Sequence, residues 1–192
     1  TELGSIIRGV AEKTATLCRV LISYLNTVHK KYLQGGKMAR RKTQKPQDNE
    51  KEKLKIFSLG GLGEVGKNVT VFEYGDEMIM VDCGVSFPDE EMPGVDLVIP
   101  DFGYLEQNSD KLKGLIITHG HEDHVGSIPY FLRSVNVPIY GTPLTLGIVE
   151  HKLSEAGILD AADLRTIKAG DKFKLGCFGI EAISVTHSIA DS

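Results

Sequence analysis

The feature that most constrains this chain is an apolar run, LIIT at residues 115–118, that leads directly into HGHEDH at residues 119–124. A short run of aliphatic and β-branched residues predicts a buried strand. Three imidazoles and two carboxylates follow it within six residues. These are ligand types that zinc takes at hydrolytic sites. A lone histidine would indicate only a polar loop, whereas this pattern predicts a metal site at the end of a strand.

The spacing of the histidines and acids predicts two metal ions. His119 and His121 leave the strand with one glycine between them, so both rings can face one ion. Asp123 and His124 follow in the turn that begins the next helix and can face a second ion. Two ions about 3.5–4 Å apart form the usual clamp for phosphoester hydrolysis. Glu122 does not fit the pattern, and we expect it to face solvent.

Two residues distant in sequence support this site. Asp82 ends a predicted strand at 78–81, where its carboxylate could hydrogen-bond a ligand histidine and fix its tautomer; a simple strand-end turn is the alternative. His187 follows Ile183–Thr186, the end of another predicted strand, and would give the first ion a third nitrogen. His29 and His151 lack such a context and are predicted to lie on the surface.

The remaining pattern from Leu54 onward predicts a layered α/β sandwich, because strands come first and then alternate with helices. The predicted strands span residues 54–59, 69–74, 78–81, 115–118, 138–140, 164–167, 172–175 and 178–185, and the predicted helices span 125–134 and 144–156.

A glycine loop at residues 61–66, GLGEVG, matches the GxGxxG pattern of dinucleotide-binding sites. That site needs a helix to begin in the loop, because the helix N-terminus holds the pyrophosphate. Here the loop runs into Val69–Phe72, which is strand-like. We therefore interpret it as a tight turn between two strands, or as a loop shaped to admit substrate.

The first 53 residues differ in character from the rest. They hold 12 Lys and Arg against 5 Asp and Glu, whereas residues 54–192 hold 10 against 21. Residues 3–33 have an amphipathic helical pattern, and residues 38–53 read as a basic disordered linker, either a solvated tail or an RNA-binding arm. Alternatively, residues 1–37 are translated upstream sequence, because Gly35–Lys37 can be encoded by a ribosome-binding site before a start codon at Met38.

Composition indicates a cytoplasmic protein. No apolar run approaches the roughly 20 residues of a membrane span, and the N-terminus lacks the pattern of an export signal. The three cysteines are widely spaced, which argues against a disulfide framework or a cysteine zinc knuckle. An acidic body does not attract a polyanion by its general field, so an RNA substrate would need metal ions, the basic segment or another part of the protein.

The metal motif and its surroundings resemble a known family. HGHEDH, with Asp82 upstream and His187 downstream, resembles the first three motifs of the metallo-β-lactamase superfamily. Three further phrases resemble the ribonuclease J family of its β-CASP branch: GGLGEVGKN from Gly60, VDCGVSFPDEEMPGVDLVIPD from Val81 and THSIADS from Thr186. The resemblance runs from about Leu54 to Ser192.

The resemblance implies the first half of a metallo-β-lactamase αββα sandwich, as a partial domain at 54–192. It does not cover residues 1–37, which we interpret from their own pattern as a helical, disordered or non-native N-terminal extension. It implies a cytoplasmic ribonuclease with 5′→3′ exonuclease and endonuclease activity in RNA maturation and decay. RNA is the expected substrate, and oligomerisation and RNA-decay partners are expected. No membrane partner is expected.

By the same resemblance, two zinc ions would activate a hydroxide for phosphodiester hydrolysis. The ligands implied are His119, His121 and His187 for one ion, and Asp123 and His124 for the other. Asp123 and Asp82 are expected to take part in catalysis, and Asn68 and Ser188 to contact substrate.

The metal-bridging aspartate, the leaving-group acid and the β-CASP domain are expected beyond Ser192, so we do not expect these residues to be active or to fold stably alone. Two other functions stay open: a related hydrolase that acts on thioesters, lactones or lactams, and a non-catalytic scaffold in RNA decay. The retained ligand set argues against the scaffold.

Overall fold

A six-stranded mixed sheet forms the centre of the computed structural model, which describes residues 52–192. Three antiparallel strands come first, each paired with the next along the chain, and three parallel strands extend the sheet from β3. The strands are β1 (Lys55–Gly60), β2 (Val69–Tyr74), β3 (Glu77–Val81), β4 (Leu112–Ile116), β5 (Ile139–Gly141) and β6 (Leu164–Thr166). The predicted strands at 69–74 and 78–81 are confirmed almost to the residue.

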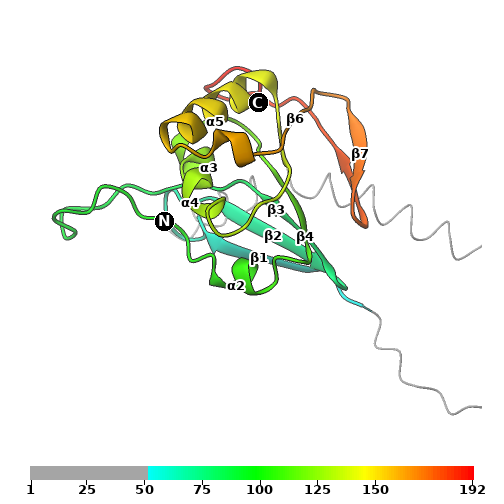
Figure 1. Ribbon diagram of the computed structural model, residues 1–192, viewed down its shortest axis with the longest axis horizontal. Coiled ribbons are helices and arrows are strands. Elements are labelled where there is room, and N and C mark those ends of the chain that lie inside the picture. The colour runs from blue at the N-terminus through cyan, green and yellow to red at the C-terminus, as the bar shows by residue number, and fades with distance from the viewer. Residues whose placement is uncertain (1–51) are drawn as a thin grey trace, which may run out of the picture. The chain divides into compact units, whose positions relative to one another are not determined.

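Helices cover one face of this sheet, as Figure 1 shows for α3, α4 and α5. The helices are α2 (Gly103–Gln107), α3 (Glu122–Val125), α4 (Ile128–Phe131) and α5 (Pro143–Glu155), followed by the 3-10 turn η1 (Leu159–Ala161). Between helices and sheet lies the main core. Its members include Val71, Met78, Met80, Leu115 and Ile139 from the sheet, and Val125, Ile128, Phe131, Val149 and Leu153 from the helices.

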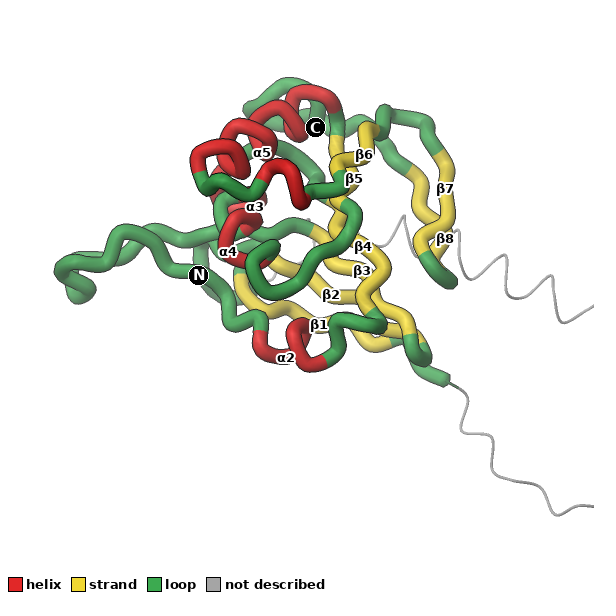
Figure 2. Tube along the Cα trace, viewed as in Figure 1, coloured by secondary structure: helices red, strands yellow, loops and turns green. Residues whose placement is uncertain are grey.

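A β-hairpin covers part of the other face. It consists of β7 (Lys172–Leu175) and β8 (Phe178–Glu181), which lie apart from α5 in Figure 2. Phe173 stacks on Tyr140 of β5 with ring centroids 5.0 Å apart. Leu175 lies against Gly114 of β4, where a Cβ would come within 3.0 Å of the leucine side chain. The predicted α/β layering is therefore confirmed, with helices on one face and a second β layer beginning on the other.

The predicted helix at 125–134 is wrong as a single element, because the structure has two short helices, α3 and α4, with a turn between them. Pro129 has no N–H to donate to Val125, so a continuous helix would lose a hydrogen bond there. Ser127 instead turns toward the preceding loop, with its N–H 2.9 Å from the Cys83 oxygen and its hydroxyl 2.7 Å from the Gly84 oxygen.

The predicted strand at 178–185 is too long, because β8 ends at Glu181 and Ile183–Thr186 are exposed and not in a strand. A strand needs a neighbour for its backbone donors and acceptors. No neighbouring strand pairs with this segment among residues 52–192. The Val185 N–H donates instead to the Ser192 oxygen at 3.0 Å.

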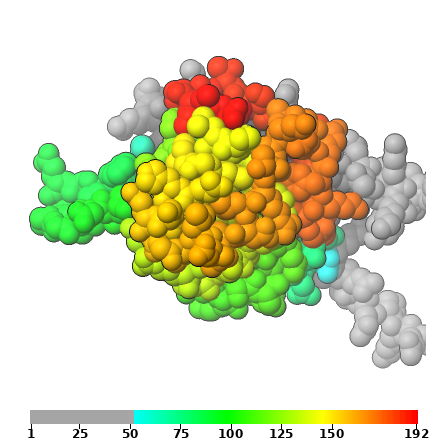
Figure 3. Space-filling model, turned by 45° about the horizontal axis from the view of Figure 1, so that its top comes forward, coloured from blue at the N-terminus to red at the C-terminus, as the bar shows by residue number. Residues whose placement is uncertain are grey.

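The glycine loop at 61–66 joins β1 to β2, which pair antiparallel, and no helix begins in it. Its interpretation as a connection between strands is confirmed. A second, longer loop follows β3 and projects from the body as the green segment at the left of Figure 3. Ser86 and Val98 close its base with two backbone hydrogen bonds of 2.9 Å.

Several predictions lie outside the described residues: the helical segment at 3–33, nearly all of the linker at 38–53, His29 and the start at Met38. Within the described part of the chain, no helix is long and apolar enough to cross a membrane. Cys83 is buried and carries a free thiol, and Cys177 is exposed.

A main-chain seam joins the turn after β3 to the start of α3; we use this name for the contacts between residues 82–85 and 121–127. The Cys83 N–H donates to the His124 oxygen at 2.7 Å, and the Val85 N–H donates to the Glu122 oxygen at 3.2 Å. Gly84 lies between these two residues, and a Cβ built on it would be 1.6 Å from the Asp123 oxygen. The seam therefore requires glycine at this position.

Replacing Gly84 with alanine should lower the free energy of unfolding by about 3 kcal/mol, because the added methyl group can only be accommodated by separating the two backbones. Gly147→Ala is the matched control, since Gly147 lies within α5 and a Cβ there meets nothing within 4 Å. It should raise the free energy of unfolding by about 0.5–1 kcal/mol. Urea denaturation of the full-length protein measures both, and a Gly84→Ala variant as stable as the wild type would refute the seam's need for glycine.

Candidate metal centre

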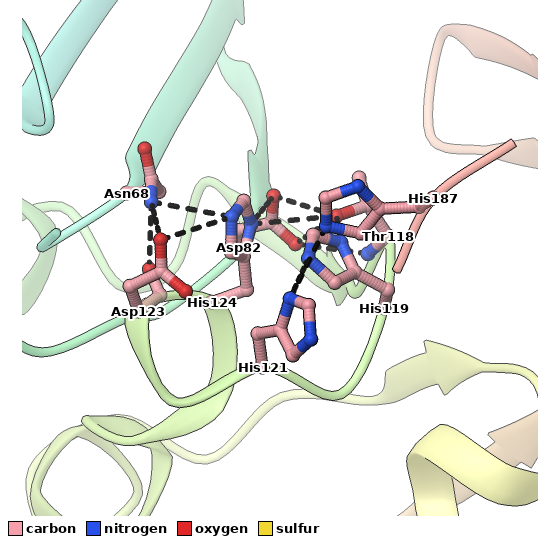
Figure 4. A network of polar contacts seen from close by, with 8 residues as sticks. All are labelled: Asn68, Asp82, Thr118, His119, His121, Asp123, His124 and His187. Carbon is pink, nitrogen blue, oxygen red and sulfur yellow. Dashed lines mark hydrogen bonds and ion pairs between the residues drawn. The ribbon is translucent and has the colours of Figure 1, made fainter. Parts of the chain in front are cut away.

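The candidate site lies where neighbouring strands of the sheet end. β3 and β4 are parallel, so their carboxyl ends meet at the same edge. Asp82 follows β3 directly, and the segment from Thr118 to His124 follows β4 into α3. His187 arrives from the segment after β8. The structure therefore brings together residues from three separated stretches of sequence (Figure 4).

Three histidine nitrogens converge in this site. His119 Nε2 and His187 Nε2 each lie 3.1 Å from His121 Nδ1. One nitrogen from each ring lies within 4.8 Å of the other two. The ring centroids of His119 and His121 are 4.8 Å apart, and those of His121 and His187 are 4.9 Å apart. All three sequence-predicted ligands of the first ion thus face one point.

This arrangement fits zinc. Tetrahedral zinc with Zn–N bonds of about 2.0–2.1 Å holds its ligand nitrogens roughly 3.3–3.4 Å apart. The 3.1 Å separations are close to that edge length. Burial, followed by repulsion from the neighbouring His124 ring, lowers the pKa of His119 to about 4, although the Asp82 carboxylate acts in the opposite direction. His119 is therefore neutral near pH 7, as a metal ligand must be.

Asp82 acts on the site through hydrogen bonds. Its side chain is buried, and its backbone has a positive φ of 62°. Oδ2 lies 2.8 Å from His124 Nδ1, and Oδ1 accepts the Thr118 N–H at 2.8 Å. A carboxylate at this distance holds the proton on Nδ1 of His124 and leaves Nε2 as the acceptor. Among the predicted ligand histidines, Asp82 contacts His124 directly.

Thr118 is a site residue that the sequence reasoning missed. Its hydroxyl lies 2.9 Å from both Asp82 carboxylate oxygens and 2.9 Å from His119 Nδ1. A hydroxyl that donates to the carboxylate can accept the Nδ1–H of His119, which directs the Nε2 lone pair of that ring toward His121. The available signal was a hydroxyl residue at the strand end immediately before the first histidine.

A second group of side chains lies beside the three nitrogens. His124 Nε2 and Asp123 Oδ2 are 3.5 Å apart, and the His119 and His124 ring centroids are 4.0 Å apart. Asn68, expected to contact substrate, points at this pair. Its Nδ2 lies 2.9 Å from Asp123 Oδ2 and 3.2 Å from His124 Nε2.

The remaining predicted residues lie outside this cluster. Ser188 follows His187 and is exposed. Glu122 is exposed, as expected, and forms an ion pair with Lys152 of α5 at 2.5 Å. His151 is exposed on α5, also as expected, 3.9 Å from Glu155.

Comparison with known proteins assigns this chain to a family. The model of the metallo-beta-lactamase superfamily matches residues 62–183. Among solved structures, the metallo-beta-lactamase fold protein YhfI from Bacillus subtilis is similar with a TM-score of 0.50 and 19% identity, covering 71% of this chain and 54% of that one. At this identity the likeness concerns the fold alone.

Curated relatives share far more sequence. Ribonuclease J from Synechocystis is 47% identical over 147 residues, which are 76% of this chain and 23% of the relative. Ribonuclease J from Thermus thermophilus is 44% identical over 154 residues, 77% of this chain and 26% of the relative. The chain thus spans about a quarter of the length of these relatives. It belongs to the metallo-β-lactamase superfamily and is a homologue of ribonuclease J.

Proposed function

We propose that this chain carries the metal-binding part of a zinc-dependent ribonuclease that hydrolyses RNA phosphodiester bonds in RNA maturation and decay. The convergence of three histidine nitrogens, from His119, His121 and His187, is the observation that carries the proposal. The ribonuclease J relatives support RNA as the substrate class. Both 5′→3′ exonuclease and endonuclease activity belong to the proposal.

The proposed domain plan follows the same relatives. Residues 54–192 would form part of a metallo-β-lactamase domain, and a β-CASP domain would belong to the full-length protein. Residues 1–37 would be a helical or non-native extension, with a basic linker at 38–53. We propose a cytoplasmic protein that assembles with itself and with other RNA-decay proteins.

Two ligand sets would hold the zinc ions. His119, His121 and His187 would bind the first, and Asp123 and His124 would bind the second. When bound, such ions lower the pKa of water toward ~7 and offset the charge that develops on the phosphoryl oxygens. The half-buried Asp123 carboxylate lies beside His124 in the second ligand set. It could also orient the attacking water or accept its proton.

Asp82 would serve as a positioning residue. It is buried and its oxygens are occupied by Thr118 and His124, so it acts on the reaction through the tautomer of His124. Ser188, exposed beside His187, remains a proposed substrate contact.

RNA binding would need positive charge from outside this acidic domain. Residues 54–192 hold 21 acidic residues against 10 lysines and arginines. Metal ions in the site, the basic residues before Leu54 and further domains of the full-length protein are the proposed sources.

Replacing His121 with alanine in the full-length protein should remove the central nitrogen of the first set. We expect the loss of one bound zinc ion and a fall of at least about 100-fold in cleavage of a 5′-monophosphorylated RNA. Metal analysis and a single-turnover cleavage assay measure these two effects. His151→Ala, an exposed histidine on α5, is the control and should change neither.

The wild-type protein decides between the alternatives in the same assay. A protein that binds no metal and cleaves no RNA would be a scaffold. A protein that binds zinc and hydrolyses a thioester, lactone or lactam, but not RNA, would be another hydrolase of this fold.

Replacing Asp82 with asparagine should weaken zinc binding by the Asp123–His124 set about 10- to 100-fold, because the amide no longer fixes the proton on His124 Nδ1. Competition with a chromophoric chelator measures the affinity of each site. The site of His119, His121 and His187 should be much less affected. Thr118→Ser keeps the hydroxyl beside Asp82 and serves as the control, and equal weakening at both sites in Asp82→Asn would argue against a specific role.

A further inference from the structure

The side-chain amide of Asn68 lies beside Asp123 and His124, where the second metal ion would bind. Its Nδ2 lies 2.9 Å from Asp123 Oδ2 and 3.2 Å from His124 Nε2, the two atoms through which these residues would bind the second ion. It also donates to the Asp123 backbone oxygen at 2.9 Å. The NH2 group has two N–H donors for these three acceptors, so the longer contact with His124 Nε2 shares a donor with Asp123. Its partial positive charge nevertheless faces the same two side-chain atoms that a metal ion would.

The tautomer of His124 makes these two partners mutually exclusive. Its Nδ1 lies 2.8 Å from the buried Asp82 carboxylate and therefore carries the proton. A neutral imidazole then has a single lone pair in the ring plane, on Nε2. That lone pair can accept a hydrogen bond from Asn68 or bind a metal ion, but not both at once.

The backbone of Asn68 is held independently of its side chain. Its N–H donates to the Asp123 oxygen at 3.0 Å, and its carbonyl accepts the Gly84 N–H at 3.2 Å. These bonds tie it to the seam residues. The carboxamide can therefore turn away from His124 by side-chain rotation while the backbone stays in place.

We propose that the Asn68 carboxamide caps the second metal site and must leave His124 Nε2 before the second ion binds. This inference rests on the proposed two-metal function. The nitrogens of His119, His121 and His187 contact one another and would bind the first ion without displacing the amide. The two ions therefore load in order, and Asn68 is a positioning residue that sets the affinity of the second.

The test is the titration of metal-free, full-length protein with Co²⁺, whose visible absorption reports each occupied site, together with calorimetry for Zn²⁺. In Asn68→Ala the second ion should bind about 3- to 10-fold more tightly than in the wild type, which corresponds to the net worth of one lost hydrogen bond. The affinity for the first ion should stay the same. Second-ion affinity that is unchanged or weaker in Asn68→Ala would overturn the cap.

Two further variants keep the test sharp. Asn68→Leu keeps the approximate shape of the side chain and removes the donor without adding a charge, so it should also tighten the second ion, and it serves if Asn68→Ala folds poorly. Asn136→Ala removes an exposed amide that donates to the Ala161 oxygen, and it should leave both affinities unchanged.

The wild-type titration separates the two levels of inference. A wild-type protein that binds fewer than two ions would overturn both the two-metal function and the cap. A wild-type protein that binds two ions, with affinities that the Asn68 variants do not change, would overturn the cap alone.

Discussion

The site depends first on a contact between two stretches of backbone. The seam brings the turn after β3 against the start of α3 so closely that Gly84 cannot carry a side chain. Four hydrogen bonds stabilise the seam. The donors are the backbone N–H groups of Cys83, Val85 and Ser127 and the hydroxyl of Ser127. Because the seam fixes where β3 ends relative to α3, the Asp82 carboxylate reaches His124 at 2.8 Å. The orientation of the His124 ring is thus a consequence of main-chain packing.

The parts of the fold that sequence could predict are those that local patterns encode. The β-branched residues of Val69–Phe72 predicted β2, and the spacing of His119, His121, Asp123 and His124 predicted the site itself. What the pattern could not show depends on contacts between distant segments. Thr118 and Asn68 gain their roles from Asp82 and Asp123, which lie 36 and 55 residues away. The segment 183–186 was predicted as a strand because its residues favour one, but pairing requires a partner that local sequence does not reveal.

The two proposed ligand sets are adjacent and differ in their surroundings. His119 is buried, and its ring lies 4.0 Å from that of His124, so protonation of one would be repelled by a charge on the other. The hydroxyl of Thr118 touches the carboxylate that orients His124 and also the ring of His119. Thr118 therefore links the hydrogen bonds of the two sets through the Asp82 carboxylate.

The exposed position of His187 has a consequence for folding. In the segment after β8, the Asp191 oxygen accepts a hydrogen bond from the Thr142 hydroxyl at 3.1 Å, and His187 Nε2 lies 3.1 Å from His121 Nδ1. An ion bound by His119, His121 and His187 would cross-link this segment to the loop after β4. Part of the free energy of metal binding would then appear as order in residues 182–192. Zinc would in that case stabilise the structure of the domain as well as take part in catalysis.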